Sequence, residues 1–321
     1  MGRLLIEVQG LTKYYDERAA IVDVTFSVPR GQVLGFLGPN GAGKSTTMRI
    51  LTGYLAASGG RASIAGQDVF QQSLEVRRRV GYLPELTPLY NEMRVDGYLD
   101  LMCRLRGVPS GRRRDRIASA IESCGLTERR RDIIGRLSKG LRQRVGLAQA
   151  VVHDPDVLIL DEPTAGLDPA QTRETRDLIS LLGRQHTVIL SSHILPEVSA
   201  TCERVVIINQ GRLVADDTPA NLGRRLSADR AQQVEVTVTG QQSEVERAIA
   251  TVKGVDSVQV TPLDGGAEQL VLVTGKREDL QKALAKALVG ADLGIRELRS
   301  RTLSLEDIYL ELTTEEVAAD G

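Results

Sequence analysis

Short apolar runs and amphipathic stretches alternate along the first part of the chain. Residues 33–37, 157–161 and 187–191 are continuous apolar runs, which are typical of strands buried on both faces of a parallel sheet. Helical periodicity begins at Lys44 after the first run and covers 169–184 after the second. This alternation predicts an α/β fold built from βαβ units.

Further elements surround these units. Strands are predicted at 4–9, 21–28, 80–84, 204–209 and 212–215. The last two form a hairpin that turns at Gln210-Gly211, and a short helix follows Asp217-Thr218-Pro219. The segment 88–150 has a helical pattern, which predicts a helical subdomain inserted into the α/β unit.

The pattern changes after a polar stretch, Leu226–Arg230, which we interpret as a linker. Beyond it, strands and helices follow the order β-α-β-β-α-β, at 234–238, 244–252, 255–260, 270–273, 277–288 and 293–298. The two middle strands are separated by a turn at 264–266, and a further helix is predicted over 302–312. This order predicts a ferredoxin-like α+β accessory domain. We therefore place an α/β domain at 1–226 and the accessory domain at 231–321.

The overall composition excludes several classes of protein. The net charge of −1 gives no global attraction to nucleic acid, and a length of 321 residues leaves room for two domains. Cys103, Cys124 and Cys202 are scattered, so neither a disulfide framework nor a zinc site is predicted. Met1–Arg3 leads straight into a predicted strand, and we expect no signal peptide. No apolar run approaches the ~20 residues that span a bilayer.

The most informative polar segment follows the first buried run. It fits the phosphate-binding pattern G-x-x-x-x-G-K-[ST]. Glycines let the backbone curl so that its N–H groups point at a triphosphate. Lys44 would reach the β- and γ-phosphates, the Ser45 hydroxyl would ligate Mg²⁺, and the helix that opens here would direct its positive dipole end at the anion. We expect nucleotide contacts from Gly38, Pro39, Asn40, Gly41, Ala42, Gly43, Lys44, Ser45 and Thr46.

Two acidic residues end the second buried run. Asp161 and Glu162 lie at the carboxyl end of a predicted parallel strand, where ligands of open α/β sheets bind. We expect Asp161 to hold Mg²⁺ through water and Glu162 to orient or deprotonate the attacking water, which contributes about 10²–10⁴-fold to a rate. A strand that ends in Asp-Glu is weak evidence by itself, because such acids are often solvated loop charges.

Three more segments strengthen the prediction of a nucleotide site. Ser138 is a good N-cap for an amphipathic helix, and Gly140 allows a ligand to approach that helix start closely. Ala165–Pro169 directly follows the Asp-Glu strand, and the third buried run ends at Ser191-Ser192-His193. A lone histidine at a strand end is usually structural, but His193 falls at the same sheet edge as the other candidates.

In this order the motifs resemble the nucleotide-binding subunit of ABC transporters over about residues 3–220. Segment 38–46 is similar to the Walker A loop and 157–162 to Walker B. The resemblance implies an ATPase with ATP and Mg²⁺ as ligands, and it assigns the chemistry to Lys44, to Glu162 as catalytic glutamate and to His193 as the histidine that contacts the γ-phosphate.

The remaining motifs match the same family. Segment 138–143 is similar to the signature motif, Leu167-Asp168 is similar to the D-loop, and Tyr15 matches the aromatic residue that stacks on adenine. The resemblance implies that two subunits, identical or related, sandwich two ATP molecules. Each subunit then contributes Ser138 and Gly140 to the nucleotide of the other.

Two motifs depart from the family pattern. The family's usual signature is L-S-G-G-Q, whereas this chain has Lys139 at the third position and Leu141 at the fifth. The glutamine of the family's Q-loop is replaced by Glu85, which can ligate a cation such as Mg²⁺ but cannot donate an amide hydrogen bond.

The resemblance implies a motor subunit that powers a separate transmembrane permease, peripheral to the cytoplasmic face of the cell membrane. The C-terminal region resembles the ABC-2 exporter branch, including drug-export and gliding-motility types. A soluble ABC-type mechanoenzyme acting on DNA or ribosomes is a rival, although the chain has one ATPase module and no coiled-coil or zinc insertion. A nucleotide-gated sensor is a third interpretation.

Two regions leave alternatives open. Residues 104–144 contain thirteen Lys or Arg and four Asp or Glu, which indicates either contact with anionic lipid headgroups or a solvated arginine-rich face. The accessory domain contains no cysteine, so metal carriage is not expected. Its role is dimer support, regulation by a ligand or partner, or passive packing.

Overall fold

The computed structural model describes residues 3–222, 232–263, 267–276 and 279–301. The chain divides into two compact units, the first ending at Pro219 and the second beginning at Ala220. The predicted linker at 226–230, the turn at 264–266 and the helix at 302–312 lie outside the described residues. Each unit is therefore described by itself.

A six-stranded sheet with the order β10-β9-β3-β8-β7-β6 forms the centre of the first unit. Its strands are β3 (Val33–Leu37), β6 (Val80–Leu83), β7 (Val157–Asp161), β8 (Thr187–Ser192), β9 (Arg204–Asn209) and β10 (Arg212–Asp217). All neighbours pair in parallel except β10, which forms the predicted hairpin with β9. Every residue of β3, β7 and β8 is buried, which explains their continuous apolar sequences.

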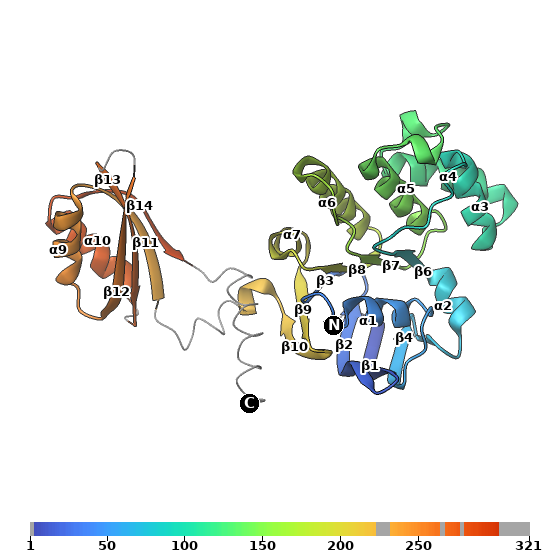
Figure 1. Ribbon diagram of the computed structural model, residues 1–321, viewed down its shortest axis with the longest axis horizontal. Helices are drawn as coiled ribbons and strands as arrows, with labels where there is room; N and C mark the ends of the chain where they lie inside the picture. Colours follow the sequence, from blue (N-terminus) through green and yellow to red (C-terminus); the bar gives the residue numbers. More distant parts are fainter. Residues whose placement is uncertain (1–2, 223–231, 264–266, 277–278, 302–321) are drawn as a thin grey trace. The chain divides into compact units, whose positions relative to one another are not determined.

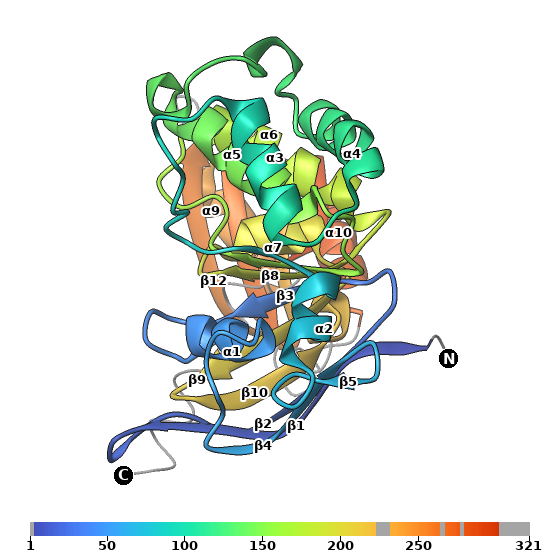
Figure 2. The same ribbon diagram turned by 90° about the vertical axis from the view of Figure 1, so that its right-hand side faces the viewer.

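The first two strands of the chain do not join the parallel sheet. β1 (Leu4–Tyr15) and β2 (Arg18–Pro29) are longer than their sequence patterns predict and form a separate antiparallel sheet with the order β2-β1-β4-β5. The sequence did not reveal its other strands, β4 (Gly59–Ile64) and β5 (Gln67–Asp68). Helix α1 (Lys44–Leu51) contacts β2 and β4 of this sheet and β7 of the parallel sheet (Figures 1 and 2).

Helices complete the first unit. α2 (Ser73–Arg79) and α7 (Leu195–Thr201) are too short to show a clear period and were not predicted. The helical segment consists of α3 (Val95–Leu105), α4 (Ser110–Ser123) and α5 (Lys139–Val151), with short 3₁₀ turns at Thr127–Arg129 and Ile134–Arg136. These helices lie together in Figure 1, and α6 (Pro169–Gly183) follows β7.

A glycine in β6 fixes how closely α5 approaches the parallel sheet. A Cβ atom at Gly81 would lie 2.0 Å from the carbonyl oxygen of Ala150, a backbone atom of α5. Any larger residue would therefore displace this helix. The N-terminus of α5 carries Ser138, so the contact also sets the position of the signature segment.

The second unit has a four-stranded antiparallel sheet with the order β12-β13-β11-β14. Its elements are β11 (Gln232–Thr239), α9 (Gln242–Ala250), β12 (Val255–Leu263), β13 (Glu268–Gly275), α10 (Leu280–Gly290) and β14 (Gly294–Arg301). This is the predicted β-α-β-β-α-β order. The valines of β11 and β13 share an apolar core with Val245 and Ile249 of α9 and Leu284 of α10.

No helix within the described ranges is long and apolar enough to cross a membrane.

Candidate functional site

The predicted residues of the phosphate loop, together with Asp161, Glu162 and His193, converge at the carboxyl ends of three adjacent parallel strands. β8 lies between β3 and β7, and its last residues pair with Leu37 and Asp161. A cavity of about 360 Å³ opens at this edge. It is lined by Ala20, Pro39, Asn40, Gly41, Gly43, Lys44, Ser45, Thr46, Glu85, Glu162, Ala165 and His193.

The loop before α1 needs glycine at two positions for different reasons. Gly41 has φ +83° with open space around its Cα, so a side chain there would be strained and would project from the loop surface. Gly43 has φ +108°, and a Cβ on it would lie 2.8 Å from the carbonyl oxygen of Ala20. The loop is therefore free of side chains where it curves.

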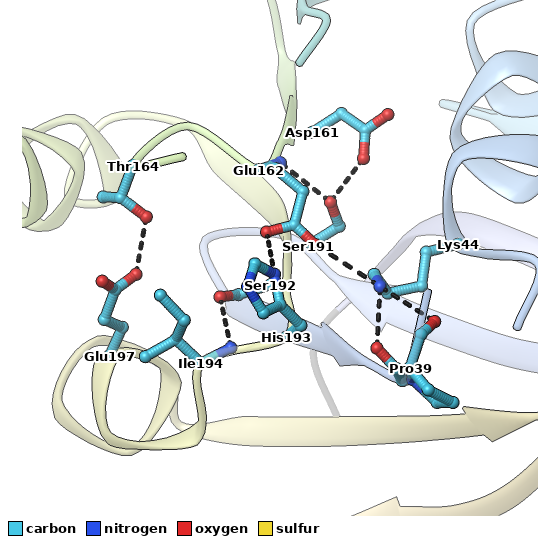
Figure 3. Close-up of polar contacts among 11 residues, drawn as sticks. Pro39, Lys44, Asp161, Glu162, Thr164, Ser191, Ser192, His193, Ile194 and Glu197 are labelled. Atoms are coloured by element: carbon cyan, nitrogen blue, oxygen red, sulfur yellow. Dashed lines mark hydrogen bonds and ion pairs between the residues drawn. The ribbon is translucent and has the colours of Figure 1, made fainter. Parts of the chain in front are cut away.

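Lys44 is buried although it carries a charge, with 5% of its surface exposed. Its Nζ donates hydrogen bonds to the carbonyl oxygens of Gly38 at 2.7 Å and Pro39 at 3.2 Å. The same atom lies 3.4 Å from Glu162 Oε1 (Figure 3). The ammonium thus stands between its own loop and the acidic end of β7.

Glu162 has a left-handed backbone conformation, which residues other than glycine rarely adopt. Its φ is +49°, and its backbone N–H donates to the hydroxyl of Ser191 at 3.0 Å. One carboxylate oxygen, Oε2, lies 2.9 Å from His193 Nδ1. The other, Oε1, is buried and has no hydrogen-bond partner among the described residues, with Lys44 as its nearby cation. A positive φ at a non-glycine residue is strained, and such strain is concentrated at functional sites.

Ser191 joins the two acids, a role that the sequence analysis missed. Its Oγ donates to Asp161 Oδ1 at 2.6 Å while it accepts from the Glu162 N–H, and the residue is fully buried. The only sequence signal is its position at the end of a buried strand. The pKa of the nearby Tyr82 phenol is raised to about 12, mainly because the group is buried and secondly because Asp161 is negatively charged. This hydroxyl therefore keeps its proton.

Several predicted residues do not line the cavity. Asp161 is 2% exposed and faces Ser191, and Gly38 and Ala42 lie within the loop behind the lining. Tyr15 is half-exposed near the β1–β2 turn, with Lys13 Nζ 5.5 Å from its ring centroid. The lining also includes Ala20 and Ala165, small residues for which the sequence carries no signal.

The residues of the signature and D-loop motifs also stand apart from this cavity. Ser138 is exposed and caps α5, since its Oγ accepts from the N–H of Leu141. Gly140 is buried against the side chain of Gln171. Asp168 caps α6 by accepting from the N–H of Gln171.

Glu85 lines both the cavity described above and a neighbouring groove. This groove, of about 700 Å³, is also bordered by Leu86, Lys139 and Arg142. Two of the three positions that depart from the family pattern, Glu85 and Lys139, therefore lie on the same groove.

The chemistry of the lining fits a nucleoside triphosphate with its metal ion. A buried ammonium, a glycine loop without side chains and a helix N-terminus all favour a phosphate chain. No cluster of three His, Cys, Asp or Glu side chains that could hold a metal occurs in the described part of the chain. Mg²⁺ suits such a place, because it is usually bound by one or two carboxylates together with substrate phosphates.

Comparison with known proteins places the chain among ABC transporter sequences. The pattern of the family described as ABC transporter matches residues 21–165. The chain is 35% identical to the uncharacterized ABC transporter ATP-binding protein YhcH of Bacillus subtilis (strain 168), over 98% of this chain and 97% of that protein. It is 33% identical to the daunorubicin resistance ATP-binding protein DrrA2 of Streptomyces coeruleorubidus, over 98% and 96%.

A solved structure described as the ATP binding subunit of an ABC transporter matches with a TM-score of 0.63 and 30% identity. The match covers 70% of this chain and 93% of the solved chain, so it extends over little more than the length of the first unit. The α/β fold with its phosphate loop is thus the ABC ATPase fold. The chain belongs to the ATP-binding subunits of ABC transporters, a family of ATPases that power separate transmembrane components.

Proposed function

We propose that the cavity binds ATP with Mg²⁺ and that Glu162 promotes attack of water on the γ-phosphate. The observation that carries this proposal is the buried Lys44 ammonium, which lies between two carbonyl oxygens of its own loop and the Glu162 carboxylate. A phosphate chain in the loop would offer this cation stronger partners than neutral carbonyls.

The residues divide the work between binding and chemistry. Lys44 and the backbone N–H groups of the loop, all but Pro39 among residues 38–46, hold the β- and γ-phosphates. Ser45, Asp161 and Glu85 are the groups that would hold Mg²⁺, which neutralises phosphate charge when bound. Ser191 keeps the Asp161 carboxylate oriented.

The hydrolytic step uses the acidic end of β7. Glu162 accepts a proton from the attacking water, and His193 Nδ1, 2.9 Å from its Oε2, fixes the direction of this carboxylate. His193 is 48% exposed on its side chain, so it also has access to the terminal phosphate. The products are ADP and phosphate.

Closure of two subunits completes the site. Ser138 is exposed at the start of α5, and Gly140 lies two residues further along the chain. A second copy or a related ATPase can therefore receive this helix start at its own γ-phosphate. Tyr15 would stack on adenine, and Asp168 would lie at the subunit contact.

We place the permease at the groove beside Glu85. Leu86 is 86% exposed on its rim, and Glu85 connects the groove to the nucleotide cavity. A permease segment seated there would change the surroundings of a residue that also faces the nucleotide. The subunit then works at the cytoplasmic face of the membrane.

The relatives suggest the direction of transport. DrrA2 is a daunorubicin resistance protein, and LnrL of Bacillus subtilis (strain 168), 29% identical over 96% of this chain, is a linearmycin resistance protein. We propose by analogy that this subunit powers export.

We also propose that part of the arginine-rich helical segment meets anionic lipid headgroups. Arg116 and Arg130 are engaged within the protein, by Asp154 and Asp96. Arg112 and Arg114 are exposed on α4 and make none of the ion pairs recorded among the described residues. Co-sedimentation with vesicles should therefore rise with anionic lipid content and fall with salt.

Calorimetry tests the central proposal. Purified full-length chain with excess Mg²⁺ should bind ATP, and the Lys44→Ala variant should bind at least about 10-fold more weakly, since one charge-assisted hydrogen bond contributes about 1.5–3 kcal/mol. Absence of heat from the parent chain, with retained thermal unfolding, would reject the proposal.

A further inference from the structure

The loop that follows Glu162, here called the D-loop segment (residues 163–168), is held by three side chains of the same subunit. Gln143 Nε2 of α5 donates to the carbonyl oxygen of Pro163 at 2.7 Å. Thr164 Oγ1 donates to Glu197 Oε2 of α7 at 2.6 Å (Figure 3). Lys139 Nζ, at the start of α5, donates to the carbonyl oxygen of Gly166 at 2.8 Å.

The contact between Lys139 and Gly166 depends on the identity of both residues. Gly166 has φ +67°, and a Cβ atom there would lie 2.2 Å from Lys139 Nζ. Glycine therefore provides the backbone turn and the space in which the ammonium lies. Lysine provides a stem long enough to cross from α5 to the loop and a charged donor at its end.

We propose that Lys139 is a positioning residue that couples the signature segment to the D-loop segment, and through it to Glu162. The proposal rests on the function proposed above. In the closed dimer Ser138 faces the nucleotide of the partner subunit, while the D-loop segment begins next to Glu162 at the subunit's own nucleotide. Lys139 is adjacent to Ser138, so its bond to Gly166 joins the two sites within one chain.

The expected effect is on turnover rather than on binding or folding. Lys139 is exposed and does not line the nucleotide cavity, so neither the first binding of ATP nor the core depends on it. One hydrogen bond from a charged donor at the surface is modest, so its loss should lower kcat by about five- to tenfold. KM for ATP should stay within about twofold.

The test compares the full-length parent with Lys139→Met and Lys139→Arg. Methionine keeps the apolar stem without the donor, whereas arginine keeps a donor of similar reach. Lys286→Met in the second unit is the control for loss of a lysine charge. Lys139→Met should lose turnover with unchanged KM and melting temperature, and Lys139→Arg should recover at least half of the parental kcat.

A second variant reaches the same contact from its other side. Gly166→Ala places a methyl group where the ammonium lies and strains the backbone at φ +67°, so it should lower kcat at least as much as Lys139→Met. Combining it with Lys139→Met should lower kcat by clearly less than the product of the two single effects, because only the backbone strain is then added. Additive losses would overturn the coupling, as would parental kcat in Lys139→Met or an equal loss in Lys139→Arg.

The two proposals fail differently. If the proposed function is wrong, the parent chain itself neither binds nor hydrolyses Mg-ATP. If only the coupling is wrong, the parent is active and the Lys139 variants match it, or lose activity together with stability.

Discussion

Lys44 Nζ lies 3.4 Å from Glu162 Oε1, and the two side chains are only 5% and 8% exposed. Removing one partner of a buried ion pair is strongly destabilising, because the remaining charge has no compensation. Lys44, the proposed phosphate-binding cation, and Glu162, the proposed general base, therefore stabilise each other in the free subunit. ATP would separate these two charges by giving the ammonium a new anionic partner.

Replacing Glu162 with glutamine should trap an ATP-bound dimer. The amide cannot accept the proton of the attacking water, so kcat should fall by about 10²–10⁴-fold. It also removes the carboxylate that competes for Lys44, so Mg-ATP should bind more tightly. Light scattering with saturating Mg-ATP should give the mass of a dimer.

The matched control for this variant is Glu246→Gln on helix α9 of the second unit. It should hydrolyse ATP at the parental rate. A Glu162→Gln protein that stays monomeric with Mg-ATP would contradict the proposed closure.

Ser191→Ala should disturb the side of the cavity where we propose that Mg²⁺ binds. The change removes the donor to Asp161 and the acceptor for the Glu162 N–H, and both lost contacts are buried. We expect a loss of about 1–3 kcal/mol in the free energy of unfolding and a higher Mg²⁺ requirement for hydrolysis. Ser192→Ala is the control, because its hydroxyl accepts from the N–H of Ile194 instead. Equal Mg²⁺ curves for both variants would refute this role.

Glu85→Gln should retain basal ATPase activity. Glutamine keeps the size of the side chain and one oxygen for the metal, and it restores the residue type usual in the family. Activity is measured in detergent-free solution without any permease. A complete loss would show that the carboxylate charge is required directly.

Gly81→Ala should destabilise the first unit. The new methyl group would lie 2.0 Å from the carbonyl oxygen of Ala150, so α5 or the strand must move, which costs about 1–3 kcal/mol. Gly111→Ala in helix α4 is the control. It meets nothing within 4 Å and should be neutral or stabilising by about 0.5–1 kcal/mol. Denaturant unfolding of both variants decides the outcome, and equal midpoints would refute the close packing.

Deleting 231–321 should weaken the ATP-bound dimer while leaving nucleotide binding intact. We expect nucleotide binding to persist, because the cavity is lined entirely by residues of the first unit, and we predict dimer support as the role of the accessory unit. The measurements are calorimetry for ATP and light scattering for mass. Unchanged dimerisation would remove this role.

The sequence alone predicted the elements whose residues are constrained locally. The buried strands β3, β7 and β8 are continuous apolar runs because both faces of a parallel sheet are covered. The phosphate loop can be predicted from the sequence because its backbone geometry requires glycines and its charge requires Lys44, all within one short segment. The second unit followed from alternation and helical period, which also depend on neighbours in sequence.

Only the tertiary structure decided what depends on contacts between distant segments. The alternation in 4–9 and 21–28 indicates strands with one exposed face, unlike the continuous apolar runs of β3, β7 and β8, but it does not specify the strands with which they pair. The links from Ser191 to Asp161 and from Lys139 to Gly166 join residues that are 30 and 27 positions apart. Such contacts arise from the packing of whole strands and helices, and a serine or a lysine in the sequence does not specify its partner.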